Sequence, residues 1–318
     1  MKLATLIYNP VAGRNPARRE QQILQAAAVL KESGIQVKLE RTAGPGCATE
    51  LARAAASDGT GVLLACGGDG TIHEVINGLY PSTIPLGILP GGTANIVANE
   101  LNLPHGPVRA ARAITNWRPR RIALGRATGF RAPQQHGEAA PRYFLSVAGV
   151  GFDAYIIHRL GFKFKMSFGV AAYVIEGLRQ VMRYAFHPVL CQVNGQEIDA
   201  TFALVQRTSL YAGWFRTAPN QSMTGSQFGV SLFRSRSRLR YFVYGAAVLA
   251  RRQLHDVDRL ETTKISFAPL HPGTKVFFEL DGELAGILPA AFDVVPDALT
   301  LLMPSPEESG QDGRRETR

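Results

Sequence analysis

A glycine-rich run that contains one acid, Gly67-Gly68-Asp69-Gly70-Thr71, has the residue types of a phosphate-binding turn. The apolar residues 61–66 before it predict a buried strand. After it, Ile72, Val75, Ile76 and Leu79 recur at helical spacing and predict a helix. Glycine allows a sharp turn and a close approach to a ligand, and the start of a helix favours an anion. The run therefore predicts a phosphate cradle. The alternative is an ordinary strand-to-helix connection.

Asp69 is the unusual residue of this cradle. A carboxylate repels phosphate unless it orients a cation or a hydroxyl group, so it indicates chemistry rather than binding alone. Two further loops, residues 9–13 and 90–95, also follow predicted strands, at residues 3–8 and 86–89. The carboxyl ends of parallel strands open on one edge of a sheet. We therefore expect the three loops to line one ligand site.

Three other motifs that bind phosphate or activate a nucleophile do not explain the sequence. The chain has no G-x-x-x-x-G-K-[ST] and no G-x-S-x-G. Residues 149–154 fit the dinucleotide pattern G-x-G-x-x-A. However, no second strand that ends in an acid follows about 20 residues later, so we do not interpret them as a Rossmann site.

The elements that position these loops alternate between strand and helix. Beyond the strands already named, we expect a strand at 35–39 and helices at about 18–33, 49–56 and 94–101, which is typical of βαβ units with a parallel sheet. After about residue 118 short strands dominate, with helices at about 168–184 and 241–254. We predict an α/β domain at 1–120, a β-rich sandwich-like domain at 121–303 and a disordered tail at 304–318. Whether the last strand returns to the first domain is left open.

Composition narrows the classes of partner. The chain has 318 residues and a net charge of +10, which suits nucleic acid, anionic lipid or phosphorylated ligands. No nucleic-acid-binding motif accompanies the charge, so we expect no nucleic-acid partner. The three cysteines, Cys47, Cys66 and Cys191, support neither a disulfide framework nor a zinc site. The first residues read as a strand rather than a signal peptide, and we expect a cytoplasmic protein.

The whole pattern resembles the diacylglycerol kinase catalytic-domain family, which includes bacterial lipid kinases and the sphingosine and ceramide kinases. The resemblance rests on residues 9–13, 67–78, 89–95 and 281–283. It implies an α/β domain like that of NAD kinases, a β-sandwich domain, and ATP with its Mg²⁺ bound between them. The Gly-Gly-Asp-Gly-Thr element is shared with NAD kinases, so by itself it indicates only a phosphate-donor site. The full set of stretches is more specific to the diacylglycerol kinase family.

The resemblance also implies roles for individual residues. Asn9 and Thr42 would contact the nucleotide, the segment from Gly67 to His73 would wrap its phosphates, and Thr93 would add a hydroxyl donor. The full predicted nucleotide-binding set is Asn9, Thr42, Gly67, Gly68, Asp69, Gly70, Thr71, Ile72, His73, Glu74, Gly92 and Thr93. The alternative role of Glu74 is local helix capping, and the alternative role of His73 is packing.

The catalytic assignments come from the same resemblance. Glu283 is the expected base for the substrate hydroxyl, with Asp281 beside it and Asp69 as the other candidate. The alternative for Asp281-Gly282-Glu283 is a plain hairpin turn, because Asp-Gly after an apolar run is a strong hairpin signal.

One segment departs from the family. After residues 216–220, bacterial relatives carry aspartates that hold a structural Mg²⁺. Here residues 221–227 read Gln-Ser-Met-Thr-Gly-Ser-Gln, with no carboxylate. Since Mg²⁺ prefers carboxylate oxygens, we predict that this structural site is lost, while the Mg²⁺ that accompanies ATP is unaffected.

Two segments suggest contact with lipid. Residues 241–250 form an apolar run flanked by six arginines at 234, 236, 238, 240, 251 and 252. Such a helix could rest on anionic lipid, or pack in the core with solvated ends. Phe162, Phe164, Met166 and Phe168 alternate with Lys163 and Lys165, as in a membrane-facing segment or a half-buried strand.

We therefore predict an ATP-dependent lipid kinase that transfers the γ-phosphate to the hydroxyl of a diacylglycerol-like or sphingoid acceptor. We expect it to be cytoplasmic and peripheral on the inner face of the membrane, and leave homodimer formation open. The alternatives are a soluble-substrate kinase such as NAD kinase, and a non-catalytic relative that binds nucleotide or membrane.

Overall fold

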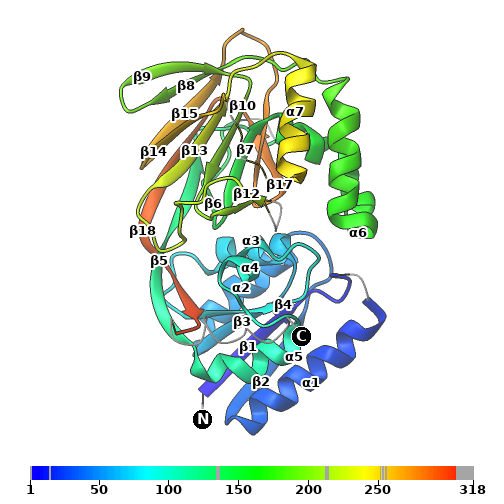
Figure 1. Cartoon of the computed structure of the whole chain (residues 1–318). Coiled ribbons are helices and arrows are strands. Elements are labelled where there is room, and N and C mark those ends of the chain that lie inside the picture. The colour runs from blue at the N-terminus through cyan, green and yellow to red at the C-terminus, as the bar shows by residue number, and fades with distance from the viewer. Residues whose placement is uncertain are drawn as a thin grey trace. The chain divides into compact units, whose positions relative to one another are not determined.

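The computed structural model describes residues 2–13, 16–133, 137–211, 215–250, 252, 254 and 256–305, with the backbone alone at 2, 16, 160–174, 215 and 249. The chain divides into two compact units (Figure 1). Unit 1 comprises Met1–Ile122 and Asp297–Arg318, and unit 2 comprises Ala123–Pro296. Strands β5 (Arg118–Thr128) and β18 (Ala290–Met303) carry the chain from one unit into the other. Most of the predicted tail, residues 306–318, lies outside the described residues.

Unit 1 is built on a parallel sheet. Its strands are β1 (Lys2–Tyr8), β2 (Ile35–Arg41), β3 (Val62–Gly67) and β4 (Leu86–Pro90), in the order β2-β1-β3-β4. The end of β18 adds a further parallel strand beside β4, with Leu301 opposite Leu86. In this register Gly67 and Pro90, the last residues of β3 and β4, lie opposite each other, and Tyr8, the last residue of β1, lies opposite Cys66, one residue before the end of β3. The loops that follow therefore start at the same edge, as the sequence predicts.

Helices cover both faces of this sheet (Figure 1). One face carries α2 (Cys47–Ser57), α3 (Asp69–Leu79) and α4 (Ile96–Glu100), and the other carries α1 (Arg19–Glu32) and α5 (Pro107–Ala113). The predicted helices are confirmed within a few residues. Helix α5 was not predicted, because it is too short to show a periodic pattern; it starts after Gly106, whose φ is 86°.

Unit 2 contains two antiparallel sheets. The strands of the six-stranded sheet, in order, are β14 (Asp258–Thr262), β13 (Phe228–Phe233), β10 (Phe202–Gln206), β7 (Val147–Gly151), β16 (Phe277–Leu280) and β17 (Glu283–Ile287). In the second, the start of β18 pairs with β15 (Lys264–Pro269), β15 pairs with β8 (Val189–Val193), and β8 pairs with β9 (Gln196–Ala200). Through β18 these strands belong to the ten-stranded sheet that starts β2-β1-β3-β4. The short strands β6 (Arg142–Phe144), β11 (Leu210–Tyr211) and β12 (Phe215–Arg216) complete the unit.

The core of unit 2 lies between its two sheets. One cluster of buried side chains joins Val150 and Phe278 of the six-stranded sheet to Phe267 and Phe292 of the other. The rings of Phe278 and Phe292 meet edge to face, 5.4 Å apart. A second cluster packs α6 (Phe152–Val181) and α7 (Arg238–Leu249) onto the six-stranded sheet. An α/β domain followed by a β-sandwich is therefore confirmed.

One local prediction was wrong. The alternation from Phe162 to Phe168 does not mark a strand, because α6 runs through it and begins at Phe152, well before the predicted start at 168. The break is at Gly151, whose φ of 90° ends β7 and lets the helix start immediately. The side chains from 160 to 174 are outside the described part, so the membrane-facing alternative is not addressed there. In the described residues no helix is both long and apolar enough to cross a membrane.

A stability test follows from the close approach of α2 and α3. A Cβ on Gly78 would lie 2.1 Å from the Thr49 carbonyl oxygen, so the two helices pack at this distance only with glycine. We expect Gly78→Ala to lower the free energy of unfolding by about 1–3 kcal/mol in chemical denaturation. Gly245→Ala in α7 is the matched control, because nothing lies within 4 Å of the added Cβ. It should raise stability by about 0.5–1 kcal/mol. Equal effects of the two changes would contradict the packing argument.

Candidate active site

Three loops of unit 1 meet at the carboxyl edge of its sheet. The Asn9 amide donates to the Cys66 carbonyl at 2.9 Å, and the Gly91 amide donates to the Gly67 carbonyl at 3.0 Å. The Asn9 side chain also donates to the Thr71 hydroxyl at 3.3 Å. The loops after β1, β3 and β4 are therefore joined to one another, as the sequence predicts.

Glycine is required where these loops touch. A Cβ on Gly67 would lie 2.4 Å from the Thr71 hydroxyl, and one on Gly92 would lie 2.3 Å from the Gly68 Cα. Gly13, at φ +80°, would bring a Cβ within 2.6 Å of the Gly91 carbonyl oxygen. Backbone therefore packs on backbone, and α3 begins at Asp69 inside this arrangement. A helix start framed by glycine backbone is a favourable place for a phosphate group.

Arg19 ties the first and third loops together. It was not among the residues predicted from the sequence. Its side chain is 6% exposed. One guanidinium nitrogen donates to the Ala12 carbonyl at 3.0 Å and to the Gly91 carbonyl at 2.5 Å. An arginine at the start of a helix looks solvated in sequence, so no local signal marks it. Burial raises the pKa of the neighbouring Cys66 thiol to about 12, which keeps that thiol neutral.

A hydrogen bond from the backbone holds the Asp69 side chain. One carboxylate oxygen accepts a hydrogen bond from the Ile96 amide, the first of α4, at 2.7 Å. Asn95 precedes α4 with φ 47°, and its side chain accepts from the Gly92 amide at 2.8 Å. Asp69 therefore fixes the third loop, which carries Thr93, against the second.

The other predicted nucleotide-binding residues differ in how they are placed. Both oxygens of Glu74 accept backbone hydrogen bonds at the start of α2, from Gly46 at 2.8 Å and Ala48 at 3.0 Å. This favours the capping alternative for Glu74. The side chains of Ile72, His73 and Thr42 are buried. For His73 this burial favours the packing alternative.

The predicted acids of unit 2 lie on a hairpin. Asp281 and Gly282, at φ 50° and 83°, form the two-residue turn between β16 and β17, with Leu280 opposite Glu283. These positive φ values are typical of the type I′ turn. The Asp281 side chain is 5% exposed. Its carboxylate accepts from the amides of Leu145 at 2.9 Å, Ser146 at 2.7 Å and Val147 at 3.2 Å. Asp281 therefore anchors the hairpin, and Glu283 is half-buried at the start of β17.

Two further acids lie beside this hairpin and were missed. Asp153, at the start of α6, and Glu279, in β16, are both buried. A Cβ on Gly149 would lie 2.4 Å from an Asp153 carboxylate oxygen and 2.7 Å from one of Glu279, so both acids pack on that glycine. The Gly282 amide donates to Glu279 at 2.5 Å. Asp153 lies within residues 149–154, which we did not interpret as a Rossmann site.

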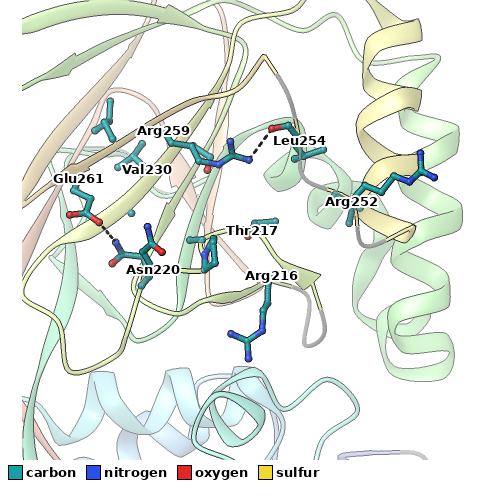
Figure 2. Close-up of a pocket in the computed structure, with 15 residues that line it drawn as sticks. Arg216, Thr217, Asn220, Val230, Arg252, Leu254, Arg259 and Glu261 are labelled. Carbon is teal, nitrogen blue, oxygen red and sulfur yellow. Dashed lines mark hydrogen bonds between the residues drawn. The ribbon is translucent and has the colours of Figure 1, made fainter.

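Unit 2 also contains a cavity of about 660 Å³ (Figure 2), within the range usual for small-molecule sites. Its walls come from β13, β14, the end of α7 and the segment 216–221. The apolar lining includes Val230, Leu254 and Leu260. Arg259 reaches across to donate to the Leu254 carbonyl at 3.1 Å, whereas Arg216 points away from the other labelled side chains (Figure 2). Polar and apolar side chains both line the cavity, and three arginines, Arg216, Arg252 and Arg259, are among them.

The anchoring of Asp281 can be tested without any substrate. Asp281→Asn replaces one acceptor oxygen with an NH₂ group that faces backbone amide donors. We expect it to lower the free energy of unfolding by about 1.5–3 kcal/mol, the range for hydrogen bonds to charged groups. Asp199→Asn, at an exposed position of β9 in the same unit, is the control and should change it by less than about 0.5 kcal/mol. Chemical denaturation followed by circular dichroism measures both, and an unchanged Asp281→Asn would refute the anchor.

Comparison with known proteins agrees with this geometry. Residues 3–127 match the family model of the diacylglycerol kinase catalytic domain, and residues 146–303 match that of the YegS C-terminal NAD kinase beta sandwich-like domain. A diacylglycerol kinase of Bacillus subtilis is 28% identical over 310 residues, which covers 96% of this chain and 97% of that protein. A diacylglycerol kinase of Mycobacterium tuberculosis is 29% identical over 306 residues, 94% of each.

Solved structures show the same fold. The crystal structure of a putative diacylglycerol kinase from Bacillus anthracis is similar with a TM-score of 0.77 at 20% identity, and 96% of each chain is covered. A yeast NADH kinase is similar at a TM-score of 0.50 and 10% identity, over 100% of this chain and 89% of that one. On the matches to both domain models, this chain belongs to the diacylglycerol kinase catalytic-domain family, a family of lipid kinases.

Proposed function

We propose that this chain transfers the γ-phosphate of ATP to the hydroxyl group of diacylglycerol. The observation that carries the proposal is the backbone-to-backbone packing of the three unit 1 loops around the start of α3, which favours an anion. The full-length similarity to proteins named diacylglycerol kinase supports the choice of acceptor.

On this proposal unit 1 binds the nucleotide. Asn9, Thr42 and Thr93 contribute side chains from the edge where the loops meet, and Gly67–His73 together with Gly92 contribute backbone. Glu74 is left out, because both of its oxygens cap α2. Asp69, Asn9 and Thr71 offer oxygen atoms of the kind that Mg²⁺ prefers, and the ion would neutralise charge on the phosphates.

Glu283 is the proposed general base. Its carboxylate takes the proton of the acceptor hydroxyl as the new oxygen–phosphorus bond forms and the bond to the departing ADP breaks. Asp281 supports it by fixing the turn through three backbone amides. Asp69 positions the third loop and the metal-bound phosphates.

The assay offers labelled ATP with diacylglycerol, monoacylglycerol, ceramide, a sphingoid base, phosphatidylglycerol and NAD in parallel. We expect phosphorylated diacylglycerol as the main product. Asp69→Asn and Glu283→Gln should each lower kcat by about 10²–10⁴-fold, the usual contribution of a positioned acid or base. Asp199→Asn serves again as the control and should retain activity.

Each other outcome has a defined meaning. Lipid product that survives both substitutions would overturn the site. Phosphorylated NAD without any lipid product would favour the soluble-substrate kinase. ATP binding without any product would favour the non-catalytic relative.

We further propose that unit 2 docks on an anionic bilayer on the cytoplasmic side, through the solvent-exposed sides of α6 and α7. Leu239 and Val243 of α7 are 73% and 50% exposed, one helical turn apart. Ile175 and Leu178 of α6 are also exposed, as is Met182, which follows the end of that helix. Tyr241 and Tyr244 pack α7 into the core. On this proposal one side of the helix packs in unit 2, and its exposed side contacts lipid.

The charge around these side chains selects the lipid. Exposed arginines neighbour them at positions 179, 183, 236 and 238. Apolar side chains beside arginines suit a membrane surface that carries negative headgroups.

Vesicle flotation tests this surface. The double change Leu239→Ser and Val243→Ser removes two apolar contacts of about 1 kcal/mol each, so binding to vesicles that contain phosphatidylglycerol should weaken by at least about tenfold. Leu24→Ser, an equally exposed leucine of α1 in unit 1, is the control and should bind normally. Equal binding of the double variant and the wild type would contradict the proposal, as would equal binding to neutral and anionic vesicles.

A further inference from the structure

A buried cation lies directly after the end of β10. Arg207 is 0% exposed and ranks among the largest fully buried side chains. No described carboxylate forms an ion pair with it. Burial lowers the pKa of its guanidinium to about 10, so the group is still charged at neutral pH. A buried charge is costly unless polar groups surround it, so its partners need to be identified.

The partners are backbone carbonyl oxygens from separate segments. One terminal nitrogen donates to Met223 at 2.9 Å and to Ala123 in β5 at 3.2 Å. The other donates to Gln227 at 3.4 Å. The Arg207 backbone amide donates to the Ser146 carbonyl at 2.8 Å. The guanidinium thus gathers three carbonyl groups from two segments, as a bound metal ion gathers oxygen ligands.

Two of these carbonyls belong to the connection between β12 and β13. That connection begins with residues 217–221, which line the cavity of unit 2. It turns tightly, with the Gly225 amide donating to the Ser222 carbonyl at 2.8 Å. Ser146, in turn, is one of the three residues whose amides hold Asp281. The Arg207 guanidinium therefore holds the connection that begins with the cavity wall, and its backbone amide bonds a residue that also holds Asp281.

The residues of this connection do not fit the structural Mg²⁺ that the family resemblance implies. Residues 221–227 contain no carboxylate. Two of their carbonyl oxygens already accept from the guanidinium, which would repel a second cation. Across the part of the chain that the structure describes, no cluster of three or more His, Cys, Asp or Glu side chains could hold a metal.

We propose that Arg207 is a built-in cation that replaces a structural metal ion. It holds residues 217–227 against β5 and β10, so unit 2 keeps its order without a divalent ion. It acts as a positioning residue for the cavity wall. The part of this inference that concerns activity rests on the proposed kinase function.

The first test measures thermal unfolding of the nucleotide-free protein with EDTA, with Mg²⁺ and with Ca²⁺. We expect the same Tm in all three. A Tm that rises with either ion and falls with EDTA would overturn the proposal, because it would reveal a structural metal site in this chain.

The second test measures amide hydrogen exchange in Arg207→Met, which removes the charge, and Arg207→Lys, which keeps it. In Arg207→Met, exchange in residues 217–227 should be at least about tenfold faster, with β1–β4 of unit 1 unchanged. Arg207→Lys should restore part of the protection, and it remains informative if the methionine variant does not fold. Arg234→Met is the control, since Arg234 is exposed and forms a surface ion pair with Asp258.

Kinetics separate positioning from general loss of structure. We expect Arg207→Lys to raise the KM for diacylglycerol several-fold and to leave the KM for ATP unchanged, because the ATP loops are in unit 1. Exchange that rises uniformly in both units, or stays unchanged in 217–227, would overturn the inference. Hydrogen exchange and Tm can be measured even if no lipid is phosphorylated. Failure of the inference about Arg207 can therefore be distinguished from failure of the proposed function.

Discussion

The close approach of three loop backbones in unit 1 is the constraint on which the candidate site depends. Gly92 and Gly13 lie where any Cβ would collide with the backbone of a neighbouring loop, and a Cβ on Gly67 would collide with the Thr71 side chain of its own loop. Because the loops follow parallel strands that end close to one another, the contact is built by the sheet itself. Arg19 and Asp69 then fix the third loop from two sides. The phosphate cradle is thus a property of packed backbone, with side chains in support.

Buried charges neutralised by backbone groups recur through the structure. Arg19 and Arg207 donate to carbonyl oxygens, whereas Asp281 accepts from three amides. Burial of a charge without partners would cost several kcal/mol, so each of these groups holds its segment in one arrangement. In this chain such charges fix irregular segments, whereas the regular sheets are held by apolar cores.

The hairpin from β16 to β17 shows why a turn and a functional role need not exclude each other. Asp281-Gly282 forms the turn that its dipeptide predicts. The same aspartate lies buried among amides of 145–147, which leaves Glu283 as the half-buried acid of the pair. Asp153 and Glu279 add two buried acids around Gly149. An acidic environment of this kind was not foreseen, because its members come from β7, α6 and β16.

The sequence by itself determined most of the elements, the common edge of the three loops and the family, because glycine turns and apolar periodicity are local. It also predicted the hairpin at 281–283. Tertiary structure decided that Glu74 caps α2, that Asp281 is an anchor, and that Arg19 and Arg207 are buried. Arg19 reaches a carbonyl 72 residues away, and Asp281 an amide 136 residues away. The partner of such a hydrogen bond is a backbone group that every residue possesses, so no residue type in the sequence identifies it.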